Sequence, residues 1–189
     1  TVTATDTGGL SVEDTFNLTV TDAPVVLVGT TGNDTITGGS GNDQLFADAG
    51  DDMVSGGAGN DIILGGPGND ILIGGDGNDA LQEFGASGNN LIEGGAGNDN
   101  LLSFGGTRSI IIGGPDTTGD VIFFPSSGSI VAYNAGDGGG RGGDVIAVND
   151  LSANLTLSLG GGIEITDLSL TQDQFARLVL SVGAIGKIY

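Results

Sequence analysis

Aspartate recurs at nine-residue intervals through the first half of this chain, always in the same local context. Between residues 29 and 102 most copies of a nine-residue unit carry glycine at positions one, two and four and an acid at position six. Carboxylates repeated in this way can bind cations, and glycine-rich turns can add main-chain carbonyl oxygens. The position-six residues are Asp34, Asp43, Asp52, Asp61, Asp70, Asp79 and Asp99, with Asn90 replacing the acid in one copy.

A large aliphatic residue at position eight keeps the same phase as the acids. Chance does not hold glycine, acid and aliphatic side chain together over eight copies. The pattern therefore indicates a repeated structural unit. The position-eight residues are Ile36, Leu45, Val54, Ile63, Leu72, Leu81, Ile92 and Leu101.

The series has two irregular places. Glu83 and Phe84 interrupt it before the copy at 85–93, and after residue 102 the pattern decays. Residues 105–114 keep glycines and aliphatic residues without an acid, and a longer loop then leads to Asp120. We expect any cation sites to weaken or stop at these places.

The elements that position the acids follow from the unit itself. Glycine permits positive φ and close backbone approach, so the start of each unit predicts a tight turn with carbonyl groups directed inward. The three following residues predict a short strand whose middle side chain points inward. Two units then form one coil of eighteen residues, and coils stack at the strand spacing of about 4.8 Å. One sheet would carry Ile36, Val54, Leu72 and Ile92, and the other Leu45, Ile63, Leu81 and Leu101.

Stacked coils also stack the acids, which makes a cation necessary. Unit charges about 5 Å apart repel by about 3 kcal/mol at an effective dielectric constant of 20. Full burial of one aliphatic side chain contributes only about 1.5–3 kcal/mol, and ordering glycine-rich backbone has an entropic cost. Ca²⁺ fits such loops because it accepts six to eight oxygen ligands in tolerant geometry, whereas Mg²⁺ requires near-ideal octahedra.

We expect the ions to lie between acids of successive coils. The pairs predicted on this basis are Asp34/Asp52, Asp52/Asp70, Asp43/Asp61, Asp61/Asp79 and Asp79/Asp99, with Asp70/Asn90 weaker because one charge is lost. Arg108 stands where a further loop should follow. One hypothesis is that its guanidinium replaces an ion and ends a stack; the alternative is a solvated loop arginine.

The composition agrees with a cation-binding role. The chain of 189 residues has 24 acidic and four basic residues, a net charge of −20, and neither histidine nor cysteine. Nucleic acids and anionic membranes are poor partners for such a chain. The missing residue types exclude disulfides, zinc–histidine sites and Ser–His or Cys–His nucleophiles. No apolar run approaches the roughly 18 residues of a membrane span.

The repeats resemble those of RTX (haemolysin-type) calcium-binding proteins. The resemblance implies an all-β fold, a right-handed parallel β-roll, in which position six provides a carboxylate and glycine-loop carbonyls complete the calcium shell. It also implies type I secretion with an uncleaved C-terminal signal. Besides the seven acids above, the ligand residues expected on this basis are Asn90, Asp120, Gly32, Gly39, Gly41, Gly50, Gly57, Gly59, Gly66, Gly68, Gly75, Gly77, Gly95 and Gly97.

The flanking segments have a different character. Residues 1–24 alternate apolar and polar side chains around a Gly-Gly turn, and resemble the last hairpin of a cadherin-like, immunoglobulin-type module. Residues 125–189 resemble the C-terminal domain that follows RTX repeats, with an inserted GGRGG and an earlier end. We therefore predict three domains, at 1–24, 25–124 and 125–189. The N-terminus has neither the features of a signal peptide nor a starting Met, so we expect the chain to begin inside a longer protein or to be a processed piece.

The function predicted from these observations is that of a calcium-folded, non-enzymatic structural module in a large secreted or cell-surface, adhesin-like protein. Several Ca²⁺ ions would be bound outside the cell, where millimolar calcium fills weak sites. Two alternatives stay open. The segment could be the folding and secretion module of a secreted protease, lipase or epimerase, or a subunit that polymerises into a filament or matrix with copies of itself or other surface components.

Overall fold

The computed structural model describes the repeat region almost completely and the flanking segments in part. Every regular element within it is a β-strand, and the described residues contain no helix long and apolar enough to cross a membrane. The described residues are 17–19, 23–85, 88–104, 108–115, 119–124, 129–133, 145–148, 156–159, 168–172 and 178–182.

Strands alternate along the chain between two sheets. The first sheet has the order β1 (Asn17–Thr19), β3 (Thr35–Gly39), β5 (Met53–Ala58), β7 (Ile71–Asp76), β9 (Leu91–Ala96), β11 (Ile110–Ile112), β13 (Ile130–Tyr133) and β16 (Thr156–Leu159). The second sheet has the order β2 (Val26–Val28), β4 (Gln44–Phe46), β6 (Ile62–Leu64), β8 (Ala80–Glu83), β10 (Asn100–Ser103), β12 (Val121–Phe124), β15 (Val145–Val148), β18 (Leu178–Val182) and β17 (Leu168–Gln172).

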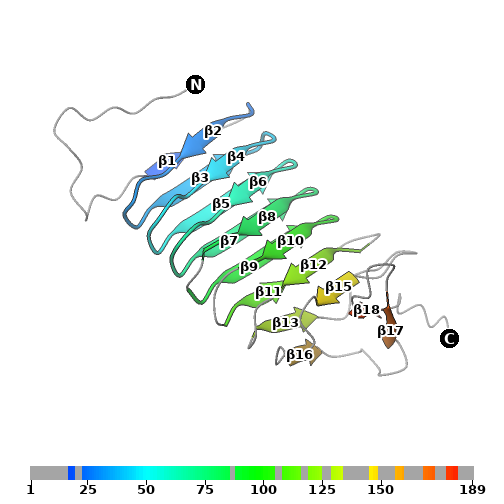
Figure 1. Cartoon of the computed structure of the whole chain (residues 1–189). Coiled ribbons are helices and arrows are strands. Elements are labelled where there is room, and N and C mark those ends of the chain that lie inside the picture. The colour runs from blue at the N-terminus through cyan, green and yellow to red at the C-terminus, as the bar shows by residue number, and fades with distance from the viewer. Residues whose placement is uncertain are drawn as a thin grey trace, which may run out of the picture.

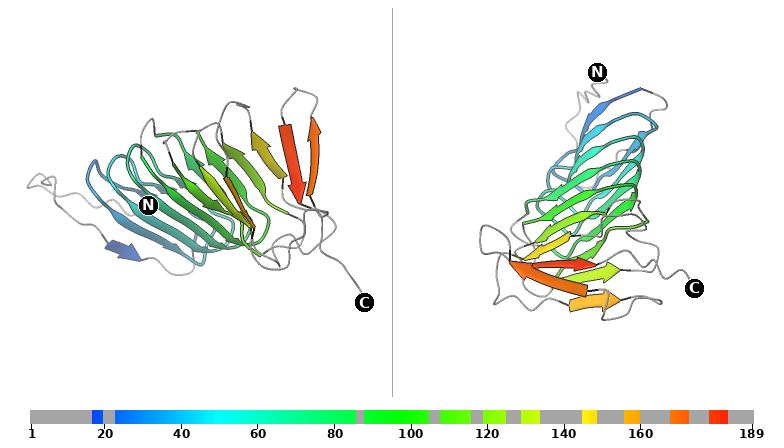
Figure 2. Two further views of the ribbon diagram at one scale, coloured as in Figure 1. Left: turned by 90° about the horizontal axis from the view of Figure 1, so that it is seen from below. Right: turned by 90° about the vertical axis from the view of Figure 1, so that its right-hand side faces the viewer.

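Each coil of the chain contributes one strand to each sheet, and successive coils stack in parallel (Figure 1). Position eight of one copy pairs with position eight two copies later, so Ile36 lies opposite Val54 and Leu45 opposite Ile63. The two further views show the same stack of flattened coils (Figure 2). The predicted parallel β-roll is confirmed, including the assignment of the aliphatic residues to two separate sheets.

The interior of the roll is one column of aliphatic side chains. Because strand residues alternate between the two faces of a sheet, positions six, eight and one point inward, and positions seven and nine point outward. Leu45, Ile63 and Leu81 are fully buried, as expected from this alternation. Within the described part of the chain, the buried core residues are Leu27, Ile36, Leu45, Ala47, Val54, Ile63, Leu72, Leu81, Ile92, Leu101, Ile111, Ile122 and Val131.

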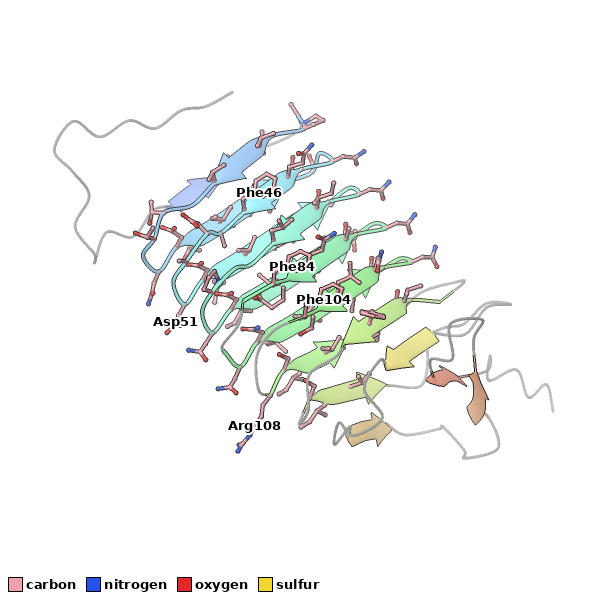
Figure 3. The ribbon with its side chains drawn as sticks, in the orientation of Figure 1. Phe46, Asp51, Phe84, Phe104 and Arg108 are labelled. Atoms are coloured by element: carbon pink, nitrogen blue, oxygen red, sulfur yellow. The ribbon has the colours of Figure 1, made fainter. Side chains whose placement is uncertain are left out.

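The two-residue interruption at Glu83-Phe84 is accommodated without breaking the sheets. The next coil contains an equivalent Ser103-Phe104, and Glu83 lies opposite Ser103 in the parallel pairing of β8 with β10. The rings of Phe84 and Phe104 stack outside the roll with centroids 5.2 Å apart and an interplanar angle of 2° (Figure 3). The two enlarged coils therefore match each other.

Strands outside the regular repeats extend the same two sheets. β1 pairs in parallel with β3, and β13, β15 and β16 continue the parallel ladders beyond residue 124. Among the described strands, antiparallel pairing occurs where β18 meets β15 and β17. The predicted hairpin at 1–24 lies largely outside the described residues, and the division into three domains remains a prediction.

Candidate metal centre

The position-six aspartates are inside the roll, which is an unusual place for carboxylates. Asp43, Asp61 and Asp70 each expose only 1% of their surface, and Asp52 and Asp79 expose 2%. They are buried because position six belongs to the same inward-facing set as the aliphatic position eight. Ionised carboxylates are almost never buried unless they are paired or bound to a metal.

The buried side chains form one column on each edge of the roll. The first edge carries Asp34, Asp52, Asp70, Asn90, Ser109 and Ser129, and the second edge carries Asp43, Asp61, Asp79, Asp99 and Asp120. All seven predicted acids and Asp120 therefore lie in these two columns. The predicted partners face each other along the stack, at a spacing of one coil.

One oxygen of each carboxylate is held by the backbone of the preceding coil. The N–H of Asp34 donates to Oδ1 of Asp52 at 2.7 Å, and the N–H of Asp52 donates to Oδ1 of Asp70 at 2.9 Å. On the second edge, the N–H of Asp43 donates to Oδ1 of Asp61 at 2.7 Å. These hydrogen bonds favour the ionised carboxylate and fix its orientation.

The other oxygen has no hydrogen-bond donor. Oδ2 of Asp43, Asp52, Asp61, Asp70 and Asp79 is buried without a partner. At Asp61, this oxygen lies beside the Cα of Gly56, where a Cβ would collide with it and would lie 2.7 Å from the carbonyl oxygen of Gly74 in the next coil. The Oδ2 atom of Asp61 and the carbonyl oxygen of Gly74 thus border one small space, where a cation could bind to both oxygens.

The glycines create this arrangement in two ways. Position one is glycine because a Cβ would fill the space beside the carboxylate. Position two is glycine because it adopts positive φ, 111° at Gly57, where a Cβ would also collide with the carbonyl oxygen of Gly39. Positive φ is found at the predicted Gly39, Gly50, Gly57, Gly59, Gly66, Gly68, Gly75, Gly77, Gly95 and Gly97.

The carbonyl oxygens at positions two and four point along the stack, each toward the glycine at the equivalent position of the next coil. A Cβ at Gly77 would collide with the carbonyl oxygen of Gly59, and one at Gly75 with that of Gly57. The first turns differ: the N–H of Gly32 donates to the Thr30 hydroxyl at 3.1 Å, and Gly41 lies against Ala23 and Pro24. Main-chain oxygens are therefore concentrated at the edges that carry the acids.

Burial makes the acids difficult to ionise in the absence of a cation. Loss of solvent raises the pKa of Asp52 to about 6, with a further contribution from the charges of Asp70 and Asp34. Loss of solvent also raises the pKa of Asp79 to about 7, assisted by Asp99 and Asp61. The pKa values of Asp61 and Asp70 are raised for the same principal reason. A bound cation would remove this penalty by neutralising the charge.

Position five faces solvent and forms a ladder of its own. The N–H of Asn60 donates to Oδ1 of Asn42 at 2.8 Å, and the N–H of Asn69 donates to Oδ1 of Asp51 at 2.9 Å. These Asn69 hydrogen bonds lower the pKa of the exposed Asp51. Asp51 and Asp52 are thus adjacent acids in opposite environments, one outside the roll and one inside.

The hypothesis that the Arg108 guanidinium replaces an ion is wrong. Pairing of Ile110 with Leu91 places Arg108 at the outward position five and Ser109 at position six. Arg108 is exposed, and its side chain extends away from the coil (Figure 3). The stack of acids on the first edge ends because Ser109 and Ser129 carry no charge, and not because an arginine neutralises it.

Two predicted ligands differ from the rest. Asp34 in the first repeat accepts hydrogen bonds at Oδ2 from the N–H and the hydroxyl of Thr30, at 2.5 and 3.1 Å. Asn90 retains the backbone hydrogen bond, since its Oδ1 accepts from the N–H of Asp70 at 2.9 Å, but its amide contributes no charge. The second carboxylate oxygen of Asp34 therefore has hydrogen-bond donors that the inner acids lack. Asn90 keeps the hydrogen bond between coils but has no negative charge.

The nine-residue pattern misses one buried acid. Glu83 is completely buried, and its Oε2 has no hydrogen-bond partner. Burial raises its pKa to about 8, with a further contribution from Asp70. The signal in the sequence is an added acid immediately before the one copy that lacks its own aspartate.

The donors present fit a hard cation with many oxygen ligands. No three acidic side chains converge within the described part of the chain, so backbone carbonyls must supply most of the ligands. The sequence contains no histidine and no cysteine, the usual nitrogen and sulfur ligands of metal sites. An oxygen-only set with irregular geometry suits Ca²⁺ better than Zn²⁺ or Mg²⁺.

A comparison with known protein families finds a match that coincides with this region. The family model of the RTX calcium-binding nonapeptide repeat (4 copies) matches residues 26–54, 47–81 and 84–107. No curated protein and no solved structure matches the chain significantly. The matched segments contain both columns of acids up to Asp99 and Asn90.

Proposed function

Because residues 26–54, 47–81 and 84–107 are RTX calcium-binding nonapeptide repeats, we propose that this chain is a structural module whose folding depends on several Ca²⁺ ions between its coils. The observation that carries the proposal is the column of buried carboxylate oxygens without donors, Oδ2 of Asp43, Asp52, Asp61, Asp70 and Asp79. Each would bind an ion together with the carbonyl oxygens of the adjacent glycine turns.

The energetic role of calcium follows from the same geometry. Without an ion, each added coil places one more carboxylate in each of the two poorly solvated columns, beside acids of like charge, while adding only two large aliphatic side chains to the core. With an ion, neighbouring carboxylates become ligands of one cation. Binding therefore supplies the free energy that the small core lacks, and folding and binding become one process.

We further propose that the module works outside the cell, in a large exported protein. The RTX resemblance and the calcium requirement support this setting, because weak calcium sites are filled at extracellular concentrations of about 10⁻⁴–10⁻³ M and not in the cytosol. The module would then stay unfolded inside the cell and fold after export. Its role is mechanical, to space or present neighbouring parts of the protein.

The test is circular dichroism of the chain in EGTA, in millimolar Mg²⁺ and in millimolar Ca²⁺. We expect disorder in EGTA, little recovery with Mg²⁺ and a β-sheet spectrum with Ca²⁺. A β-sheet spectrum of equal strength in EGTA would overturn the proposal.

A pair of variants then assigns the effect to the buried column. Asp52→Asn removes a buried charge while keeping a hydrogen-bond acceptor, as Asn90 does naturally. Asp51→Asn removes an exposed charge from the adjacent residue and creates the asparagine found at position five of most copies. We expect Asp52→Asn to raise the calcium concentration needed for folding, and Asp51→Asn to leave it nearly unchanged.

A further inference from the structure

Glu83 occupies a place in the roll that glycine or alanine holds in other coils. The carbonyl of Gln82 accepts the N–H of Gly65 at 3.1 Å, just as the carbonyl of Leu64 accepts the N–H of Ala47 at 2.9 Å. Glu83 therefore follows the position-one residues Ala47 and Gly65 along the stack. The two-residue insertion puts a long acidic side chain into an inward slot where the regular repeat has almost none.

The carboxylate of Glu83 is held in a defined orientation. Oε1 accepts a hydrogen bond from the N–H of Gly85 at 2.8 Å. Oε2 points the other way, into the roll, and is buried without a hydrogen-bond partner. A Cβ at Gly65 would collide with this oxygen and would lie 3.0 Å from Oδ2 of Asp70. The unpartnered oxygens of Glu83 and Asp70 therefore border the same small space.

This space lies between the two coils where the regular pattern loses a charge. We call the space between two successive coils at one edge a gap. In the preceding gap of the first edge, Asp52 and Asp70 provide one carboxylate from each coil. In this gap Asp70 is followed by Asn90, whose Oδ1 preserves the 2.9 Å backbone hydrogen bond without a negative charge. With Glu83 included, the gap again has two carboxylates.

We propose that Glu83 is a calcium ligand that replaces the missing aspartate charge in the gap between Asp70 and Asn90. The inference rests on the proposed calcium-dependent function and adds to it a site that the nine-residue pattern does not contain. Asp70 Oδ2 and Glu83 Oε2 would be the two carboxylate ligands of this site. The ion column of the first edge then passes through the insertion and does not stop at it.

Among the residues that the structure describes, the site is also the last one on its edge. The next residues in the column are Ser109 and Ser129, whose side chains carry no charge. The opposite edge continues with acids at Asp99 and Asp120, and the N–H of Asp99 donates to Oδ1 of Asp120 at 2.7 Å. The insertion thus extends a column that would otherwise end one coil earlier.

The test is the number of calcium ions bound by the whole chain, measured by native mass spectrometry and by equilibrium dialysis. Glu83→Gln keeps the shape and the acceptor for the Gly85 N–H but removes the charge. Glu93→Gln removes the same charge from the outward-facing side of β9 and serves as the matched control. We expect Glu83→Gln to bind one ion fewer than the unmodified chain, or to bind one ion at least tenfold more weakly. Glu93→Gln should match the unmodified chain.

A second variant separates ligation from a purely structural role. Asn90→Asp combined with Glu83→Gln returns a carboxylate to the gap at the regular position, and we expect it to restore the lost ion. If Glu83 were instead a protonated partner of Asp70, glutamine would donate the same hydrogen bond and the ion count of Glu83→Gln would not change. That result, or failure of Asn90→Asp to restore the ion, would overturn the inference. A chain that binds no calcium at all would overturn the proposed function itself.

Discussion

The backbone N–H of Asp61 donates a 2.8 Å hydrogen bond to Oδ1 of Asp79, one coil further along the second edge of the roll. Asp61 in turn accepts the N–H of Asp43 with its own Oδ1. Each carboxylate is therefore fixed by the fold through one oxygen and left open through the other. The same side chain helps to build the coil with one oxygen and offers the other, buried oxygen to a cation.

Removal of one inner charge should weaken binding more than removal of a charge at the end of a column. Asp61 has acids on both sides, whereas Asp34 begins its column and has donors from Thr30. We expect Asp61→Asn, which removes the charge of a proposed ligand, to reduce calcium affinity by at least about 10–100-fold, the range for loss of a group that only supports a metal ligand. Asp34→Asn should have a smaller effect. Calcium titrations followed by circular dichroism would measure both, and equal effects would contradict the prediction.

A methyl group at position one should close the space beside the carboxylate. A Cβ at Gly74 would collide with Oδ2 of Asp79 and with the carbonyl oxygen of Gly94. We expect Gly74→Ala to lower both calcium affinity and the melting temperature in calcium.

The opposite substitution, from alanine to glycine, can be made at Ala47, because Ala47 occupies position one of its copy. Ala47→Gly should strengthen calcium binding at Asp52, measured by the same titration; a weaker site would argue against the space as the ion position.

Acidification should stabilise the calcium-free fold. Burial raises the pKa of Asp52 to about 6, of Asp79 to about 7 and of Glu83 to about 8, above their ordinary values of 3.8 for Asp and 4.5 for Glu. The folded chain therefore binds protons more tightly than the unfolded chain, and its stability rises as the pH falls from about 8 toward 4. Circular dichroism of the chain from which calcium has been removed beforehand should show more β-sheet at pH 5 than at pH 8; the prior removal is needed because EGTA loses its affinity for calcium when it is protonated.

Two controls accompany this pH series. High salt at pH 8 screens exposed charges but not buried ones, so salt alone should recover little structure. Protons and Ca²⁺ compete for the same carboxylates, so calcium affinity should fall as the pH is lowered. Loss of β-sheet from the calcium-free chain on going from pH 8 to pH 5 would refute the prediction.

Replacement of Asp48 by glycine should stabilise the turn that contains it. Asp48 has φ of 74° and is the one non-glycine residue with positive φ among the described residues. Its place is position two, where most copies have glycine. Left-handed backbone costs roughly 1–2 kcal/mol for a residue with a Cβ, less for Asp, and part of the gain from glycine is lost to entropy.

We therefore expect Asp48→Gly to raise the unfolding free energy in calcium by at most about 1 kcal/mol, measured by urea denaturation. Ala49→Gly, in the same turn without positive φ, is the control. It should lower stability by about 0.4–1 kcal/mol. A destabilised Asp48→Gly variant would show that the Asp48 side chain contributes more than its backbone strain removes.

The sequence predicts most of the repeat region correctly because each unit carries its own local signals. Glycine determines where the chain turns, and one aliphatic residue in each short strand determines which face is buried. A fixed period then makes every coil equivalent, so the pairing of Ile36 with Val54 follows because the two residues are one eighteen-residue coil apart. The same counting assigns the seven aspartates to two columns.

Where the period changes, counting no longer determines the neighbours. Counting the unit from Gly105 puts Arg108 at position four, whereas the pairing of Ile110 with Leu91 puts Arg108 at the outward position five and Ser109 at the inward position six. Local residue types do not distinguish these positions, because the choice depends on pairing with β9 one coil away. The extent of the sheets beyond residue 124 has the same origin, since the ladders from β11 to β16 are long-range contacts.

Residue types and their period were thus enough to determine the β-roll, the two edges and the need for a cation at the aspartates. Only the tertiary structure decided that Glu83 enters the column beside Asp70, because its position depends on how a 20-residue coil stacks on an 18-residue one. The nine-residue pattern identifies the aspartates at position six because each unit contains the whole pattern. It does not identify Glu83, because the neighbours of Glu83 depend on how two coils of different length pack on each other.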